Sequence, residues 1–342
     1  MTKKRITAKD VADRAGVSRP LVSMYLSGNK KAWLSEETKK RIDEAVATLG
    51  YRPNVLARAL RSGRSHTIGL LMGGISDPVG GLLAEIVMDE AEKKGYRLFV
   101  AVTHFDRKKE REVFLNMLNY QMDGIIYTLS ADYNDTFFRQ FEHSSCPVLL
   151  TENHPELPLD GVAYSLKTGL KEAVLHFRQQ GCKNVLMYSG VHDLTIEALR
   201  ELAEETECSF STYDWQLASK SPQMLIEKIS RSRPDLIVLG DGRMSLDTSL
   251  FPPGYSPRII CASMLPLLDR APDGLLYLPF RERLTAAVEL LIDRIEHPGK
   301  EVQKIIIPSV FHPSAEAQLL REQHASDPRF SFLASRCHLN YN

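Results

Sequence analysis

The chain has 342 residues, of which 43% are apolar and 25% charged, which is enough for one to three soluble domains with buried cores. This composition excludes a collagen, a coiled-coil rod and a largely disordered chain as the main state. No apolar run approaches the roughly 18 residues of a membrane-spanning helix, and no apolar segment follows the basic start, so a cytoplasmic protein without a membrane partner is expected.

The charges are unevenly distributed along the chain, although they sum to zero. Residues 1–65 hold 15 Lys and Arg against 6 Asp and Glu, a net charge of +9, so the rest of the chain carries −9. Clustered cations gain free energy by releasing counterions from a phosphate backbone. The asymmetry therefore favours a polyanion as the partner of this N-terminal head over a merely solvated basic surface.

Two short helices joined by a glycine turn are predicted at the start of the head. Thr7 can cap a helix over Ala8–Ala15 that Gly16 ends, and Ser18 can cap a second helix over Arg19–Leu26. Small and β-branched side chains on both segments supply a miniature core. This pattern is typical of the helix-turn-helix motif, and a structural bundle that does not touch DNA is the alternative.

A third helix and a short hinge are predicted next. Ser35 can cap the third helix and Gly50 can end it. Within residues 51–63, Pro53 suits a helix entry and Gly63 can close a helix of about two turns. Such a short helix is marginal alone, so we expect a hinge that orders only on a partner helix or on DNA.

The segment from Ile6 to Gly69 carries an ordered series of motifs: AKDVADRAGVSRPLVSMYLSG, LSEETKKRI, LGYRPN, ARALRSGRS and TIG. The series closely resembles the lactose/galactose-repressor (LacI/GalR) family. That resemblance implies a bacterial transcription regulator, most often a repressor, that binds a palindromic operator in double-stranded DNA as a homodimer. It also implies a body that is built like a periplasmic sugar-binding protein and senses a small-molecule effector.

The resemblance implies DNA contacts at particular residues of the head. Arg19, Pro20 and Met24 would face base edges in the major groove, where Arg19 can donate two parallel hydrogen bonds to guanine. Pro20 and Met24 can only touch or exclude thymine methyl groups. Phosphate contacts, which fix the register without reading sequence, are expected from Ser18, Ser23, Tyr25, Asn29, Lys30 and Lys31.

The predicted hinge carries an apolar side chain, Leu60, beside small residues such as Ala57. In a symmetric dimer two such hinge helices would meet over the operator centre. An apolar side chain inserted through the minor groove can part a base step and kink the duplex. We therefore expect Asn54, Ala57 and Leu60 at the minor groove. Packing of Leu60 against the body or the partner's hinge is the alternative.

The body, from about His66, alternates predicted strands and helices. Strands are expected at 67–72, 97–103, 124–128, 148–151, 185–188, 236–239 and 259–261, with helices between them and a long helix at 281–296. The predicted fold is thus an all-α helix-turn-helix head plus an α/β, periplasmic-binding-protein-like body with two doubly wound parallel-sheet subdomains. The resemblance implies three crossings between the subdomains, near Ala163, Pro279 and Pro308, and an effector in the cleft between them.

The expected domain boundaries follow from these elements. They are a helix-turn-helix domain at 1–50, a hinge helix and linker at 51–65, an effector-binding domain at 66–324 and a C-terminal tail at 325–342. One subdomain would comprise about 66–163 and 280–307, and the other about 164–279 and 308–324. A tetramer-forming tail is not expected, because residues 324–342 hold no leucine heptad.

Open α/β sheets bind ligands beyond the carboxyl ends of their strands. Residues near those ends that match effector contacts in the family are Asp77, Pro78, Asp132, Arg200, Asp241 and Ser263. Helix capping by Asp77 and surface ion pairs of Asp132 and Arg200 are the alternatives. Ser263 lies where relatives carry a sugar-gripping carboxylate, and this departure leaves open whether the effector is an ordinary sugar.

An enzyme and a periplasmic-type solute-binding protein are the competing classes. The sequence has neither a G-x-S-x-G elbow nor an H-E-x-x-H motif, and its histidines show no metal-ligand spacing. Five scattered cysteines without a C-x-x-C motif indicate inert, reduced thiols. We therefore expect no catalytic residue, no cofactor and no metal.

Overall fold

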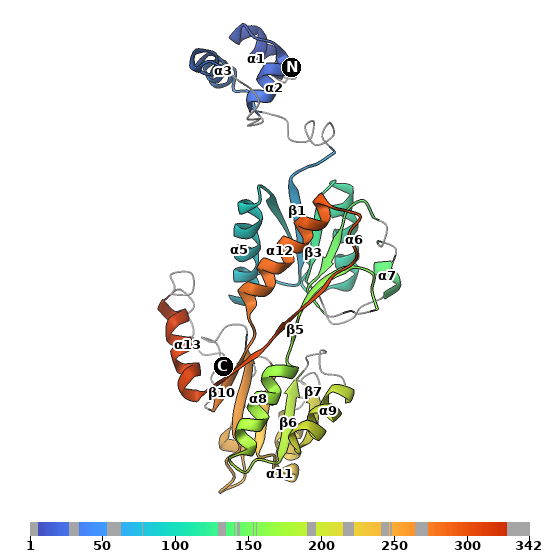
Figure 1. The fold of residues 1–342 in the computed structure, drawn as a ribbon, viewed down its shortest axis with the longest axis vertical. Helices are drawn as coiled ribbons and strands as arrows, with labels where there is room; N and C mark the ends of the chain where they lie inside the picture. Colours follow the sequence, from blue (N-terminus) through green and yellow to red (C-terminus); the bar gives the residue numbers. More distant parts are fainter. Residues whose placement is uncertain are drawn as a thin grey trace. The chain divides into compact units, whose positions relative to one another are not determined.

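The computed structural model divides the chain into two compact units, residues 1–65 and 66–342 (Figure 1). The residues that the structure describes are 6–26, 34–52, 63–76, 78–128, 135–139, 141, 144–152, 154, 156–189, 196–214, 222–240, 246, 248–263 and 273–326.

The described residues of the first unit form three helices: α1 Ala8–Ala15, α2 Arg19–Leu26 and α3 Glu36–Leu49. Thr7 begins α1 through a capping box with Asp10, and Gly16 ends it in the left-handed conformation, at φ 64°. The buried core consists of Val11, Ala12, Ala15, Val22, Ile42 and Ala45. The glycine turn therefore lets two short helices share one core with α3.

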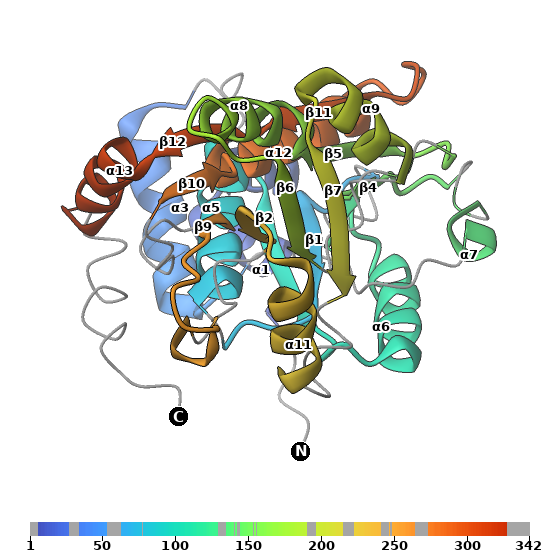
Figure 2. The same cartoon turned by 90° about the horizontal axis from the view of Figure 1, so that it is seen from below.

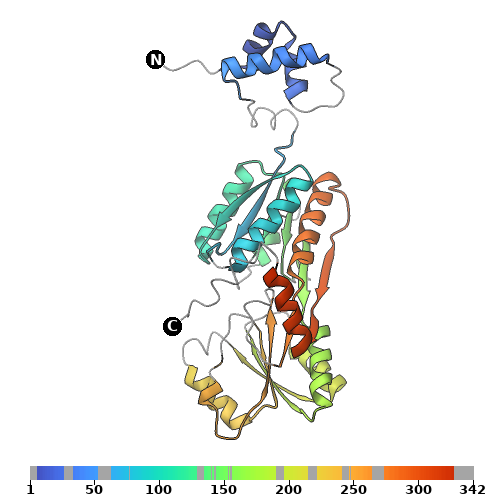
Figure 3. The same cartoon turned by 90° about the vertical axis from the view of Figure 1, so that its left-hand side faces the viewer.

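The second unit contains two lobes, each built on a six-stranded sheet. The first sheet is parallel, in the order β11-β5-β4-β3-β1-β2, with β1 Thr67–Met72, β2 Arg97–Val102, β3 Gly124–Tyr127, β4 Val148–Leu150, β5 Asp160–Ser165 and β11 Lys304–Pro308. Helices α5 (Pro78–Lys93) and α12 (Phe280–Glu296) lie side by side over one face (Figure 3). The other face packs against α6 (Arg107–Asn119) and α7 (Asp135–Arg139).

The second sheet has the order β12-β10-β9-β8-β6-β7, with β6 Asn184–Ser189, β7 Ser209–Asp214, β8 Leu236–Leu239, β9 Arg258–Ser263, β10 Gly274–Tyr277 and β12 Val310–Pro313. Helices α8 (Lys167–Arg178) and α9 (Ile196–Thr206) cover one face and α11 (Pro222–Ser232) the other (Figure 2). A 3₁₀ turn, Thr248–Leu250, lies between β8 and β9, and α13 (Ser314–Ser326) follows β12.

The chain passes between the lobes after Ser165, at Pro279 and at Ser309. Strand β5 continues two residues beyond the crossing expected near Ala163, because Ser165 still pairs with Pro308 of β11. Strand β12 is antiparallel to β10, since it enters the second sheet from the first lobe. The other strands of each sheet run parallel, so the carboxyl ends of both sheets face the junction between the lobes.

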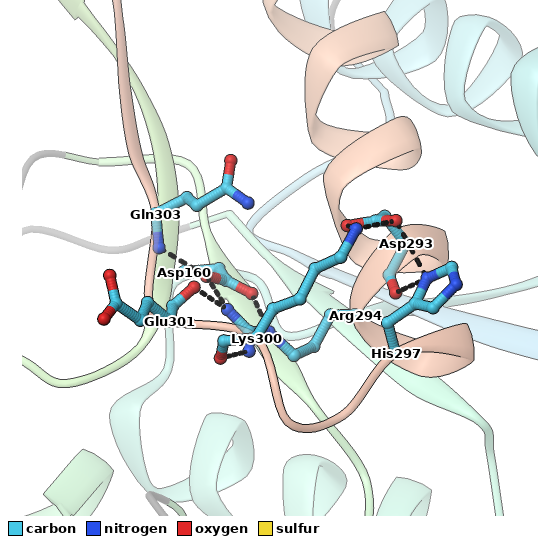
Figure 4. A network of polar contacts seen from close by, with 7 residues as sticks. All are labelled: Asp160, Asp293, Arg294, His297, Lys300, Glu301 and Gln303. Atoms are coloured by element: carbon cyan, nitrogen blue, oxygen red, sulfur yellow. Dashed lines mark hydrogen bonds and ion pairs between the residues drawn. The ribbon is translucent and has the colours of Figure 1, made fainter.

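A buried ion pair fixes the far end of α12 to the first sheet (Figure 4). Arg294 donates from Nε and Nη2 to the two carboxylate oxygens of Asp160, at 2.7 and 2.8 Å. Its guanidinium also bonds the carbonyls of Lys300 and Glu301, and Asp160 accepts from the Gln303 backbone N–H at 2.8 Å. The pair therefore holds the loop that leads into β11 against the start of β5.

Candidate functional site

Helix α2 buries one side chain in the head and exposes the residues at its N-terminal end. Val22 is fully buried in the core of the head, whereas Ser18, Arg19 and Pro20 are exposed. Ser23, Met24 and Tyr25 are half-buried. Because α2 is only two turns long, its N-terminal residues form the accessible end of a helix that is anchored by one buried side chain.

Tyr25 ties α2 to α3. Its hydroxyl donates a 2.8 Å hydrogen bond to a carboxylate oxygen of Asp43, and this bond raises the pKa of Tyr25. Ser18 caps α2 by accepting from the Leu21 backbone N–H at 3.4 Å. The hydroxyl groups of Ser18 and Tyr25 therefore both contribute to the architecture of the head.

Several predicted site residues lie outside the part of the chain that the structure describes. They are Asn29, Lys30 and Lys31 after α2, Asn54, Ala57 and Leu60 of the hinge, and Asp77, Asp132 and Asp241 of the body. Pro78 begins α5, and only its backbone is described.

The two remaining effector candidates occupy different environments. Arg200 is exposed on α9, whose Leu199 and Leu202 face the core. Ser263 is buried at the carboxyl end of β9, and its carbonyl accepts a 3.0 Å hydrogen bond from the backbone N–H of Leu278. The described contacts do not bring Arg200 and Ser263 together.

A cluster that the sequence analysis missed lies where the first sheet meets α12. Arg283, in the first turn of α12, is buried and donates from Nη1 to the carbonyl of Thr151 at 3.0 Å. Its guanidinium carbon lies 4.3 Å from the ring centroid of Tyr164 and 5.9 Å from that of Phe280. Thr151 follows β4 and Tyr164 lies near the end of β5, so the cluster occupies the strand ends where ligands of α/β sheets bind.

Within the described residues, no group of three or more His, Cys, Asp and Glu side chains could hold a metal ion. Cys146, Cys182, Cys208 and Cys261 are buried, and burial raises the pKa of the Cys146 thiol to about 12. No described helix is long and apolar enough to cross a membrane.

Comparisons with known proteins agree with this geometry. Residues 7–54 match the family model "Bacterial regulatory proteins, lacI family". The HTH-type transcriptional regulator PtxS of Pseudomonas putida is 31% identical over 201 residues, which is 59% of each chain. Catabolite control protein A of Staphylococcus xylosus is 32% identical over 189 residues, 54% of this chain and 56% of the relative. The chain thus spans less than two thirds of the length of these curated relatives.

Solved structures show the same fold at low sequence identity. The lac repressor dimer bound to operator and the anti-inducer ONPF has a TM-score of 0.73 and 18% identity, covering 91% of this chain and 99% of that one. The transcriptional regulator CelR–cellobiose complex has a TM-score of 0.61 and 16% identity, covering 91% of this chain and 99% of that one.

Residues 7–54 thus form a helix-turn-helix domain of the lacI family of bacterial regulatory proteins. The two-lobed α/β body has the fold of the lac repressor, and the chain is similar over more than half of its length to the transcription regulators named above.

Proposed function

We propose that the protein is a sequence-specific transcription regulator that binds a palindromic operator as a homodimer and represses transcription in the cytoplasm. A small-molecule effector, a sugar or a sugar derivative, would bind between the lobes of the body and alter operator affinity. One observation carries the proposal: α2 exposes Arg19 and Pro20 in a head of net charge +9 while Val22 holds the helix in the core.

The exposed end of α2 suits the major groove. Arg19 can donate two parallel hydrogen bonds to O6 and N7 of guanine, while Pro20 and Met24 discriminate by apolar contact with thymine methyl groups. Ser18, Ser23, Asn29, Lys30 and Lys31 would contact phosphates. Tyr25 would join them only by exchanging its bond to Asp43 for one to a phosphate oxygen.

The hinge would complete the operator contacts. Asn54, Ala57 and Leu60 are proposed to lie in the minor groove, with Leu60 parting the central base step. Flexible pyrimidine–purine steps would favour that kink. Two hinges related by the dimer axis explain why a palindrome is the expected target.

The effector site is proposed at the facing carboxyl ends of the two sheets. Asp77, Pro78, Asp132, Arg200, Asp241 and Ser263 are the proposed contacts. A ligand regulates DNA binding only if it binds one arrangement of the lobes better than the other. Pro279 and Ser309, on two of the crossings, are where such a rearrangement would be absorbed.

Selection of DNA from a random library by the full chain tests the proposal. We expect recovered sites to share a palindrome and to bind about 10³-fold or more tightly than random DNA at physiological salt. Equal affinity for selected and random DNA would contradict it. A chain that binds sugars but no DNA would be a solute-binding protein, and turnover of such a ligand would indicate an enzyme.

A further inference from the structure

Helix α12 contains two arginines whose side chains are largely buried, and they differ in one respect. Arg294 pairs with Asp160, whereas Arg283 has no carboxylate within ion-pair distance among the described residues. Arg283 is nevertheless only 4% exposed. An uncompensated buried charge is costly, and proteins retain one mainly where function uses it.

The environment of Arg283 satisfies only part of its hydrogen-bonding capacity. Nη1 bonds the Thr151 carbonyl, and the guanidinium stacks on the rings of Tyr164 and Phe280. The Nε of Arg283 is buried and has no acceptor. Native structures rarely leave such a donor unpaired, so the missing acceptor needs an explanation.

A second buried donor without a partner lies beside it. Tyr164 is 9% exposed, its hydroxyl has no hydrogen-bond partner, and its ring lies against the Arg283 guanidinium. Burial raises the pKa of Tyr164, so this hydroxyl keeps its proton at neutral pH and remains a donor. Two donors and one positive charge therefore lie together without an acceptor.

We propose that Arg283 and Tyr164 bind the negatively charged group of the effector, a carboxylate or a phosphate. An anion here would accept from Nε of Arg283 and from the Tyr164 hydroxyl, and it would neutralise the buried charge. The inference rests on the proposed function, because it gives the chemical class of the ligand at the same strand ends. It also fits the departure at Ser263: a site without its usual sugar-gripping carboxylate repels an anion less.

Three six-carbon sugars that differ at one position probe the site: glucose, glucuronate and glucose 6-phosphate. Inorganic phosphate serves as a fourth probe, and sodium chloride matches the ionic strength of all samples. Binding to the full chain is measured by calorimetry and by the thermal unfolding midpoint, which a ligand raises with the logarithm of its concentration once that exceeds the dissociation constant. We expect at least one anion to bind wild type at least tenfold more tightly than glucose. Tighter binding of glucuronate would identify a carboxylate as the bound group, and tighter binding of glucose 6-phosphate would identify a phosphate.

Variants assign the binding to the two residues. Arg283→Met keeps the length of the side chain without its charge and should weaken the bound anion about 10- to 100-fold. Arg283→Lys keeps the charge but loses the planar guanidinium, so its affinity for the anion should lie between those of wild type and Arg283→Met. Tyr164→Phe should cost about 3- to 10-fold. Tyr213→Phe is the matched control, because its hydroxyl is also buried without a partner but lies on β7.

A purely structural Arg283 gives a different result. It predicts that Arg283→Met lowers the unfolding midpoint of the ligand-free protein, whereas an empty anion site predicts an unchanged or raised midpoint, because an uncompensated charge has been removed. The proposal is overturned if glucose binds as well as its anions, if no anion binds wild type, or if Arg283→Met and Tyr164→Phe bind the anion as wild type does. Wild type that selects an operator but binds no anion would refute this inference alone. Anion binding that depends on Arg283 in a chain that selects no operator would refute the proposed function alone.

Discussion

Gly169 of α8 lies directly against Ser309, the residue that joins the two sheets. A Cβ at position 169 would stand 2.7 Å from Oγ of Ser309 and 3.0 Å from its carbonyl carbon and oxygen. Ser309 is held in place by its N–H, which donates to the Ser165 carbonyl at 2.8 Å, and by its hydroxyl, which donates to the Leu166 carbonyl at 3.2 Å. Two of the three crossings are thereby bonded to each other beneath α8.

Gly169→Ala should therefore destabilise the body by about 1–3 kcal/mol, since backbone atoms of the crossing must shift to admit one methyl group. Urea unfolding followed by circular dichroism measures the change. Gly81→Ala in α5 is the matched control, because its Cβ would meet only the Ile75 carbonyl at 3.7 Å. There the gain in helix propensity should stabilise the protein by up to about 1 kcal/mol. The same sign for both variants would contradict the close approach at Ser309.

Arg294→Met should lower the free energy of unfolding by about 3–5 kcal/mol, because it leaves the buried carboxylate of Asp160 without its cation. Adding Asp160→Asn should restore part of the loss, as measured by a double-mutant cycle in urea. Arg231→Met, which breaks an exposed pair with Glu227 on α11, should cost less than about 0.5 kcal/mol. Equal losses of unfolding free energy at positions 294 and 231 would show that burial does not strengthen the Arg294–Asp160 pair.

The Tyr25–Asp43 bond predicts a pH dependence of the head. Folding raises the pKa of Tyr25 above its ordinary value of 10.0, so the fold favours the protonated phenol. Its contribution is fully present below pH 10 and is lost as the pH rises through the raised pKa. Tyr25→Phe should lower head stability by about 0.5–1.5 kcal/mol at neutral pH and remove this alkaline loss. An identical pH profile in wild type and Tyr25→Phe would mean that the bond does not form in solution.

Leu60→Ala tests the proposed wedge. The variant should weaken specific operator binding and reduce DNA bending in a circular-permutation assay, while the head stays folded and the dimer intact. An unchanged bend would make the hinge a linker only.

The sequence predicts those elements of the fold that carry a strong local pattern of apolar residues. The predicted strands over residues 67–72 and 236–239 match β1 and β8, because both are continuous apolar runs buried on two faces. Strands β5, β7, β10, β11 and β12 went unrecognised. The pairing of β11 with β5 and of β12 with β10 depends on contacts between distant parts of the chain, and Ser309 alone separates β11 from β12.

The Arg283 cluster, too, is only partly predictable from local sequence patterns. Arg283 lies at helical spacing with Ala287 and Leu291, so the sequence already places one charge on an apolar face. Which groups surround that charge is set by Thr151 and Tyr164, more than a hundred residues away along the chain. Periodicity can flag such a residue, but only the fold shows that its charge is uncompensated.

Competition binding by Arg19→Ala tests the central claim most directly. Arg41→Ala, at an exposed arginine of α3, controls for the loss of one positive charge. We expect Arg19→Ala to lose about 1–3 kcal/mol of preference for a guanine in each half-site while its affinity for random DNA stays close to that of Arg41→Ala. Equal losses of affinity for operator and random DNA in the Arg19 variant would contradict base reading by α2, and with it the account of how this head recognises its operator.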